Sequence, residues 1–173
     1  MAEKTIHFVI TGGTLDSVYD GTKDTAVPSK NSALPQFVKS LKLYQKSVFT
    51  QVCMKDSRAI TRADLKKILN TINRSPHKKF IVTHGTYTMS DSARYIESKL
   101  IGKDKTIIFT GSVIPLIGFS PSDAPFNLGF SIAKLQELNP GVYVCMNGKA
   151  FHAKESSKII REGRFVSLFG ENK

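Results

Sequence analysis

Five short segments of the sequence carry glycine, small hydroxyl side chains or both, a combination suited to binding a small polar molecule. They are residues 11–14 (Thr-Gly-Gly-Thr), 55–58 (Lys-Asp-Ser-Arg), 84–88 (His-Gly-Thr-Tyr-Thr), 111–112 (Gly-Ser) and 147–148 (Asn-Gly). Glycine lets backbone amides approach a ligand closely, and hydroxyl groups both donate and accept hydrogen bonds. Glycine and threonine also serve tight turns and helix caps, so one segment alone is ambiguous. The five together favour a site for a small polar ligand.

Each of these segments directly follows a predicted β-strand. Short runs of branched and aromatic apolar residues predict strands at residues 6–10, 48–53, 80–83, 106–110 and 142–146. Such nearly continuous apolar strands are typical of a parallel sheet that is covered on both faces. The carboxyl ends of parallel strands lie at one edge of the sheet, where ligands bind in open α/β folds. We therefore expect the five segments to gather at that edge.

Amphipathic stretches between the strands predict helices. The first predicted helix runs from Ser32 or Ala33 to Leu43, and the second begins at Thr61 and Asp64, which form a capping-box-like start. Two more helices are predicted over residues 90–100 and 126–138. A polar segment occupies residues 12–30, and residues 158–166 predict a small hairpin or an edge element. The alternation predicts one α/β domain over residues 1–173: a doubly wound, Rossmann- or flavodoxin-like, mostly parallel sheet with helices on both faces.

The formal net charge of +11 raises the question of an anionic partner. The basic residues are spread over amphipathic stretches such as residues 61–69 and form no block interleaved with aromatic side chains. We therefore expect solvated helix faces that steer small anions, and no nucleic-acid partner. No apolar run approaches the roughly 20 residues that cross a bilayer, so we expect no membrane contact. The first residues lead directly into a strand and show no signal-peptide pattern. The sequence therefore predicts a cytoplasmic protein.

Several familiar sites are missing from the sequence. The first strand is not followed by G-x-G-x-x-G, and the sequence contains neither a P-loop motif nor a G-x-S-x-G elbow. We predict no cofactor and no metal, because no ligand-like spacing relates the four histidines, which are His7, His77, His84 and His152. His84 is expected to be a hydrogen-bonded structural residue of its loop. Cys53 and Cys145 lie in apolar runs and are expected to be reduced core residues.

At these segments the sequence resembles the N-terminal domain of the bacterial-type L-asparaginase family. The family's T-G-G-T corresponds to residues 11–14, and its T-H-G-T-D-T-M to residues 83–89. Residues 122–128 resemble the family's S-D-G-P-F-N-L, and residues 141–148 resemble its next strand and turn. Lys158 falls where the family places a catalytic lysine, and the match keeps this order from Ile6 to Lys158. The resemblance implies an asparaginase N-terminal-domain type of fold.

The resemblance also implies a threonine amidohydrolase. Thr14 would attack the side-chain amide carbon to form an acyl-enzyme, while Thr86 and Lys158 would assist proton transfer. A threonine hydroxyl is a weak nucleophile that needs an adjacent base, and a lysine with a lowered pKa can provide one. The implied substrate-binding residues are Gly13, Ser57, Arg58, Gly85, Tyr87 and Ser112. Among these, the backbone around Gly13 and Gly85 would supply amides to the oxyanion, and Ser57 would hold the substrate α-carboxylate.

The chain departs from the family pattern in three ways. Family members are about twice as long, and their smaller C-terminal domain, from a neighbouring subunit, helps to recognise the substrate ammonium. Tyr87 replaces the family aspartate that orients the lysine and binds this ammonium, so we expect weaker ammonium recognition and a Lys158 pKa that favours the base form. Arg58 replaces a glutamine, and a guanidinium there can bind a carboxylate bidentately. The resemblance is therefore to a short, single-domain branch.

The sequence leaves two functions open. The first is an enzyme that hydrolyses the side-chain amide of asparagine, or of a related small carboxylate-bearing amide, and releases ammonia. The second is a catalytically weak or inactive relative that binds a small carboxylate as a regulatory module. In either case the partner is a small amide or dicarboxylate. A homodimer or higher homo-oligomer is expected, because family members associate through this domain.

Overall fold

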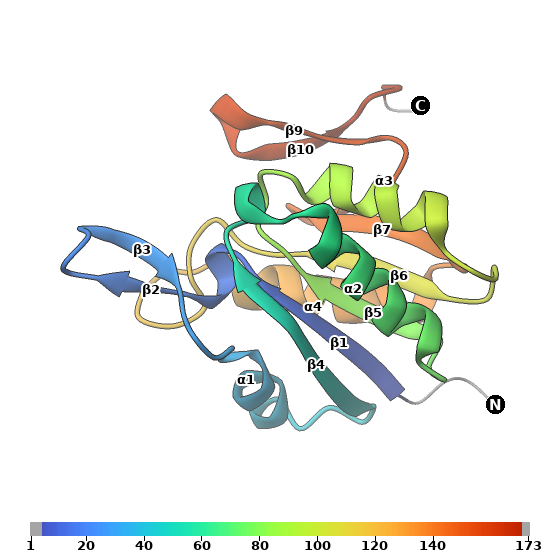
Figure 1. The fold of residues 1–173 in the computed structure, drawn as a ribbon, viewed down its shortest axis with the longest axis horizontal. Coiled ribbons are helices and arrows are strands. Elements are labelled where there is room, and N and C mark those ends of the chain that lie inside the picture. Colours follow the sequence, from blue (N-terminus) through green and yellow to red (C-terminus); the bar gives the residue numbers. More distant parts are fainter. Residues whose placement is uncertain (1–4, 171–173) are drawn as a thin grey trace.

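A six-stranded sheet forms the centre of the protein, whose computed structural model describes residues 5–170 (Figure 1). The strand order is β4-β1-β5-β6-β7-β8, and all neighbours are parallel except β8, which pairs antiparallel with β7. The strands are β1 (Thr5–Gly12), β4 (Lys46–Lys55), β5 (Lys79–Thr83), β6 (Thr106–Thr110), β7 (Gly141–Met146) and β8 (Lys149–His152). The fold is thus the predicted α/β type with a mostly parallel sheet.

Helices cover both faces of this sheet. On one face, α2 (Arg62–Arg74) and α3 (Met89–Lys99) bury Ile72 and Ile96 against strand residues such as Phe80. On the other face, α1 (Leu34–Ser40) and α4 (Ala124–Glu137) bury a second apolar cluster that contains Phe8 and Ile108. Because β1, β5, β6 and β7 contribute side chains to both clusters, they are nearly continuous in apolar residues, as doubly covered parallel strands must be.

Two small hairpins lie outside the sheet. The first pairs β2 (Ser17–Asp20) with β3 (Thr25–Pro28) and projects from the body of the molecule, beyond the carboxyl end of β1 (Figure 1). The second pairs β9 (Ser156–Ile159) with β10 (Arg164–Ser167) and lies beside α3. The second hairpin carries Lys158 to the side of the sheet on which α3 begins.

The predicted elements agree with the structure, with a few differences. All five predicted strands are present, and Thr61 and Asp64 form a capping box at the start of α2. The expected hairpin near residues 158–166 is also present. The helix that was expected to reach Leu43 ends at Ser40, and Lys42 has a left-handed φ of 50°. The sequence did not predict β8 or the β2–β3 hairpin inside the polar segment.

The two cysteines are free thiols, and their burial differs. Cys145 is buried as predicted, and burial raises the pKa of its thiol to about 12. Cys53 is only half-buried, and burial raises the pKa of its thiol to about 11. Within residues 5–170, no helix is long and apolar enough to cross a membrane. No group of three or more His, Cys, Asp or Glu side chains is placed to hold a metal ion in the same range.

Candidate active site

Glycines allow the loops after β1, β4 and β5 to touch one another. Gly12 and Gly13 have φ angles of 94° and 75°, a region that L side chains rarely adopt. A methyl group on Gly12 would lie 2.6 Å from the Lys55 backbone nitrogen, and one on Gly13 would overlap the backbone of Gly85. A methyl group on Gly85 would in turn lie 2.8 Å from Cβ of Ser57. Main chain packs on main chain here.

The loop after β6 joins the same cluster, whereas the loop after β7 does not. A methyl group on Gly111 would overlap the carbonyl oxygen of His84, so these two backbones are in contact. By contrast, Asn147 accepts a hydrogen bond from the Phe165 backbone amide at 3.0 Å and so holds the second hairpin. Gly148 faces the Phe126 ring. Four of the five predicted segments therefore gather, and residues 147–148 serve a structural purpose.

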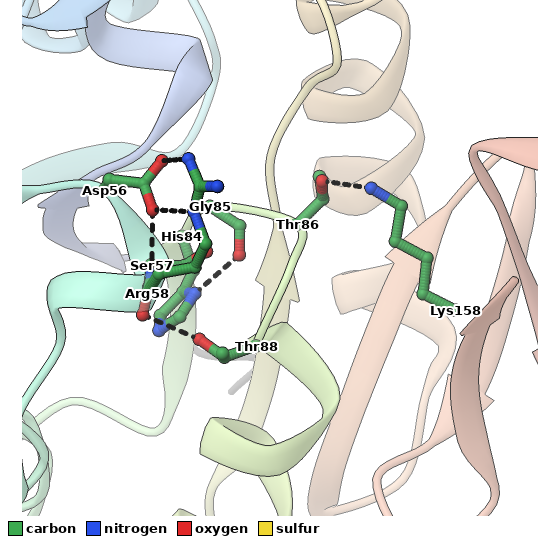
Figure 2. A network of polar contacts seen from close by, with 8 residues as sticks. All are labelled: Asp56, Ser57, Arg58, His84, Gly85, Thr86, Thr88 and Lys158. Atoms are coloured by element: carbon green, nitrogen blue, oxygen red, sulfur yellow. Dashed lines mark hydrogen bonds and ion pairs between the residues drawn. The ribbon is translucent and has the colours of Figure 1, made fainter. Parts of the chain in front are cut away.

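A threonine and a lysine meet at the centre of the cluster. The Lys158 amino group lies 2.6 Å from the Thr86 hydroxyl, and Figure 2 shows the two side chains pointing toward each other from β9 and from the loop after β5. Thr86 is buried and Lys158 is partly buried. Burial lowers the pKa of Lys158, because the charged form loses hydration. A hydroxyl beside a lysine with a lowered pKa is the arrangement of a nucleophile or proton relay with its base.

Thr14 occupies a less constrained position. It begins η1 (Thr14–Asp16), a 3-10 turn, and is half-buried. Within residues 5–170, its hydroxyl makes no hydrogen bond. The contact between Gly13 and Gly85 places Thr14 and Thr86 directly after two touching residues. The backbone of Thr14 therefore begins at this cluster, and no base in the described part of the chain contacts its hydroxyl.

The backbone amide of Gly13 is not free to bind an oxyanion. It donates a hydrogen bond of 2.9 Å to the carbonyl oxygen of Lys55, which fixes the first loop to the end of β4. Of the backbone amides around Gly13 that were expected to bind the oxyanion, this one is therefore occupied. Gly13 contributes a close backbone contact instead, and the Lys55 side chain is itself held by Asp64 at 2.7 Å at the start of α2.

Ser57 is held from two sides. It is buried under Gly85, and its carbonyl oxygen accepts a hydrogen bond of 2.9 Å from the Thr88 hydroxyl (Figure 2). Sequence reasoning did not predict this supporting contact, which links the loop after β4 to the loop after β5. Ser112 is also buried, and its hydroxyl has no hydrogen-bond partner in the described part of the chain. The loop after β6 thus brings an unpaired hydroxyl into the interior.

Arg58 and Tyr87 lie side by side at the surface of the cluster. The guanidinium carbon of Arg58 is 5.7 Å from the centre of the Tyr87 ring, a cation–π distance. The same guanidinium binds Asp56, with Nε 2.9 Å from Oδ1 and Nη2 3.4 Å from Oδ2. The hydrogen bond from Arg58 is the main reason why the pKa of Asp56 is lowered. Asp56 was not predicted as a site residue, although its spacing of two from Arg58 is a possible signal for such a pair.

His84 is fully buried and structural, as expected from the sequence. Its Nδ1 lies 2.8 Å from the carbonyl oxygen of Gly85, which fixes the ring within its own loop (Figure 2). Burial lowers the pKa of His84, because the imidazolium would lose its hydration. Burial thus favours the neutral ring, which braces the loop from which Thr86 projects.

The chain also matches known proteins. A family model for the N-terminal domain of asparaginase matches residues 5–164. The thermostable L-asparaginase from Thermococcus kodakarensis has a similar structure, with a TM-score of 0.81 at 22% identity over 94% of this chain and 51% of that protein. L-asparaginase I from Vibrio cholerae gives a TM-score of 0.77 at 26% identity, covering 96% of this chain and 52% of that protein.

A third similar structure is the probable cytoplasmic L-asparaginase from Campylobacter jejuni. Its TM-score is 0.80 at 21% identity, covering 95% of this chain and 53% of that protein. The chain therefore spans about half the length of the solved structures that it matches. A search of curated protein sequences gives no match. The family match covers most of the chain and the matched structures share its fold, so the protein belongs to the asparaginase family, whose N-terminal domain corresponds to residues 5–164.

Proposed function

We propose that the protein is an L-asparaginase-like amidohydrolase with a threonine nucleophile. It hydrolyses the side-chain amide of asparagine, or of a related small carboxylate-bearing amide, and releases ammonia. The observation that supports this most is the 2.6 Å contact between the Thr86 hydroxyl and the Lys158 amino group. Because the chain belongs to the asparaginase family, amide hydrolysis is the reaction that we assign to this pair.

In the proposed reaction, the Thr14 hydroxyl oxygen attacks the amide carbon while the pair formed by Thr86 and Lys158 accepts its proton. That proton then moves to the amide nitrogen, the carbon–nitrogen bond breaks, and ammonia leaves an ester on Thr14. Water attacks this ester, returns a proton to Thr14 and releases the acid. General-base assistance of this kind typically contributes 10²- to 10⁴-fold to the rate. The lowered pKa of Lys158 supports the proposal, because a neutral amine is needed at the start.

The remaining predicted residues are proposed to bind the substrate. Ser57 and Gly85 lie beside Thr86 in the contact cluster and would bind the carboxylate and the developing oxyanion. Ser112 would help through its unpaired hydroxyl, and Arg58 and Tyr87 would border the substrate at the surface. Gly13 would shape the site through its backbone contact alone.

The test is ammonia release from asparagine, glutamine and succinamate. We expect Thr14→Ala, Thr86→Ala and Lys158→Met each to lower kcat by about 10²- to 10⁴-fold. Matched controls are Thr71→Ala and Lys66→Met on α2, which should leave the rate unchanged. Equal rates in Thr14→Ala and the unmodified protein would remove Thr14 as nucleophile. Mapping a trapped acyl group to Thr86 would instead make the lysine-bound threonine the nucleophile.

A second function is a catalytically weak module that binds small carboxylates. The unpaired Thr14 hydroxyl favours it, because no base contacts this side chain within residues 5–170. This function predicts that aspartate or succinate raises the Tm while no amide releases ammonia. Ammonia release that depends on Thr14 would exclude it.

We also propose that the active form is a cytoplasmic homo-oligomer consisting of one asparaginase-like domain per chain. Large apolar side chains are exposed on the segment from Gly111 to Phe126, whose single charged residue, Asp123, accepts hydrogen bonds from the backbone amides of Val113 and Ile114. An apolar surface without basic side chains adds no repulsion of its own where two copies of a chain with a net charge of +11 meet. Light scattering after size-exclusion chromatography should show a dimer or larger species, which Ile117→Lys weakens and the control Ile160→Lys does not. A monomeric mass for the unmodified protein would contradict this.

A further inference from the structure

Arg58 has donors left over after its pairing with Asp56. The two hydrogen bonds to Asp56 use Nε and Nη2, and the side chain remains 69% exposed. Arginine has five N–H donors in a planar fork that matches a carboxylate. No partner contacts Nη1 within residues 5–170, so this edge of the fork is available to a ligand.

Asp56 and Tyr87 hold the guanidinium in one orientation. Asp56 fixes one edge of the guanidinium, and the Tyr87 ring lies 5.7 Å from its carbon atom. Because Tyr87 follows Thr86 directly, and Arg58 follows Ser57, the fork is anchored beside the proposed reaction centre. A donor group that is already oriented loses less entropy when it binds an anion.

Among the described loops that surround Thr86, no exposed carboxylate is left unpaired for a substrate ammonium. Asp16, after β1, has no partner for its Oδ2, but this oxygen is buried and Oδ1 binds Ser32 and Ala33. Asp56 is bound by Arg58, and Asp91 pairs with Arg94 at 2.6 Å. Asp123, in the loop after β6, accepts the backbone amides of Val113 and Ile114 at 2.8 to 3.1 Å. One face of the Tyr87 ring, which otherwise attracts cations, is taken by Arg58 itself.

We propose that the site selects monoamides of dicarboxylic acids that lack an α-ammonium group, and that Arg58 binds their free carboxylate. The inference rests on the proposed amidohydrolase function. With unused donors on the exposed Arg58 guanidinium and no exposed unpaired acid beside it, the cluster offers a partner to a carboxylate and none to an ammonium. Arg58 is thus a specificity-determining residue.

The kinetic test compares succinamate with asparagine, which differ by the α-ammonium group. We expect kcat/KM to favour succinamate by about tenfold or more, and Arg58→Gln to lower the succinamate value by about 10- to 100-fold, as for a lost charge-assisted hydrogen bond. The matched control is Arg62→Gln, because the guanidinium carbon of Arg62, on α2, lies 5.8 Å from the centre of the Tyr95 ring, on α3, in a similar stack. The control should change neither value.

A binding test separates this inference from the proposed function. Calorimetry should show that succinate binds more tightly than aspartate, and that Arg58→Gln but not Arg62→Gln weakens succinate. Arg58-dependent succinate binding without release of ammonia from any amide would overturn the proposed function and uphold only the binding of a carboxylate by Arg58. Preferred hydrolysis of asparagine would uphold the function and overturn the inference. Succinate binding that is unchanged in Arg58→Gln would also overturn it.

Discussion

The two threonine-bearing loops, residues 11–14 and 84–88, differ in how firmly the protein holds them. The second loop follows β5, an interior strand of the sheet, and is braced by His84, by Thr88 on Ser57 and by Lys158 on Thr86. The first loop is fixed at Gly13 and at Leu15, whose carbonyl oxygen accepts the Leu116 amide. Within residues 5–170, however, the Thr14 hydroxyl makes no hydrogen bond, and the hairpin that follows forms a two-stranded sheet of its own. One loop is prepared before a ligand arrives, whereas the other has freedom to move when it binds.

This difference fits two separate tasks in the proposed reaction, proton transfer and nucleophilic attack. A proton relay has to be oriented in advance, because its efficiency depends on short, aligned hydrogen bonds. A nucleophile that must also admit a substrate gains from a segment that opens and closes. The contacts of Thr86 and Thr14 fit these two tasks.

Hydrogen exchange gives the largest expected contrast. Amides of the β2–β3 hairpin should open with a free energy near zero to about 2 kcal/mol, whereas those of β5 should approach the global stability, roughly 5–15 kcal/mol. The hairpin forms a two-stranded sheet of its own, while β5 lies between β1 and β6. Mass spectrometry of peptic peptides can measure both. Equal protection of the two regions would contradict the proposed difference in mobility.

Gly13→Ala should be the most damaging substitution in the first loop. The new methyl group would overlap the Gly85 backbone at a φ of 75°, so we expect a loss of about 2–4 kcal/mol in the free energy of unfolding. Urea denaturation can measure the loss. Gly118→Ala is the matched control, because Gly118 has a φ of 82° and open space around it. Similar losses for both variants would show that backbone strain, and not the contact between the loops, is responsible.

Acid should weaken the second loop and not the first. The pKa of His84 is lowered by burial, so the unfolded chain binds more protons than the folded one just below the ordinary histidine pKa of about 6.5. Stability should therefore fall as the pH drops through that value. His7, whose pKa burial also lowers, acts in the same direction. Urea denaturation at pH 7.5 and pH 5 should show a smaller loss for His84→Asn than for the unmodified protein.

The first loop should respond to acid in the opposite direction. Burial raises the pKa of Asp16, so its contribution is fully present below the ordinary aspartate pKa and is lost as the pH rises through the folded value. The hydrogen exchange of residues 11–16 should therefore not accelerate between pH 7.5 and pH 5, after correction for intrinsic rates. Faster corrected exchange there than in the second loop would contradict this.

Thr88→Val should have the smallest effect. It removes the hydrogen bond from the Thr88 hydroxyl to the Ser57 carbonyl, which we expect to lower stability by about 1 kcal/mol. Thr71→Val is the control, because the Thr71 hydroxyl bonds only to Lys67 within α2. Thermal unfolding can measure both. If Thr88→Val were as stable as the unmodified protein, Ser57 would not depend on this contact.

Most of the fold could be predicted from the sequence, because its strands and helices carry strong local patterns. Residues 80–83 and 106–110 are continuously apolar, and the capping box at Thr61 is a local signal. β8 was missed, because four residues with a lysine and a histidine show no strand pattern. The Asp20-Gly21 pair in the polar segment is a turn signal that could have indicated the β2–β3 hairpin.

The site was less accessible to sequence reasoning. Thr86 and Lys158 are 72 residues apart, and only the family resemblance suggested that they act together. The hydrogen bond between Gly13 and Lys55 joins loops from different strands, and no spacing rule relates such residues. The pairing of Arg58 with Asp56 was local but competed with many other partners for a surface arginine. Tertiary contacts decided the first two cases, and the choice among several possible partners decided the third.

The main-chain contact between Gly13 and Gly85 also restricts which positions of this protein can be substituted during evolution. Neither position has room for a methyl group, so mutation at either is selected against before any new substrate is tested. The exposed side chains of Arg58 and Tyr87 border the same cluster and carry no such restriction. A library randomised at positions 58 and 87 should therefore yield folded variants with altered preference, whereas one at 13 and 85 should yield mostly unfolded chains.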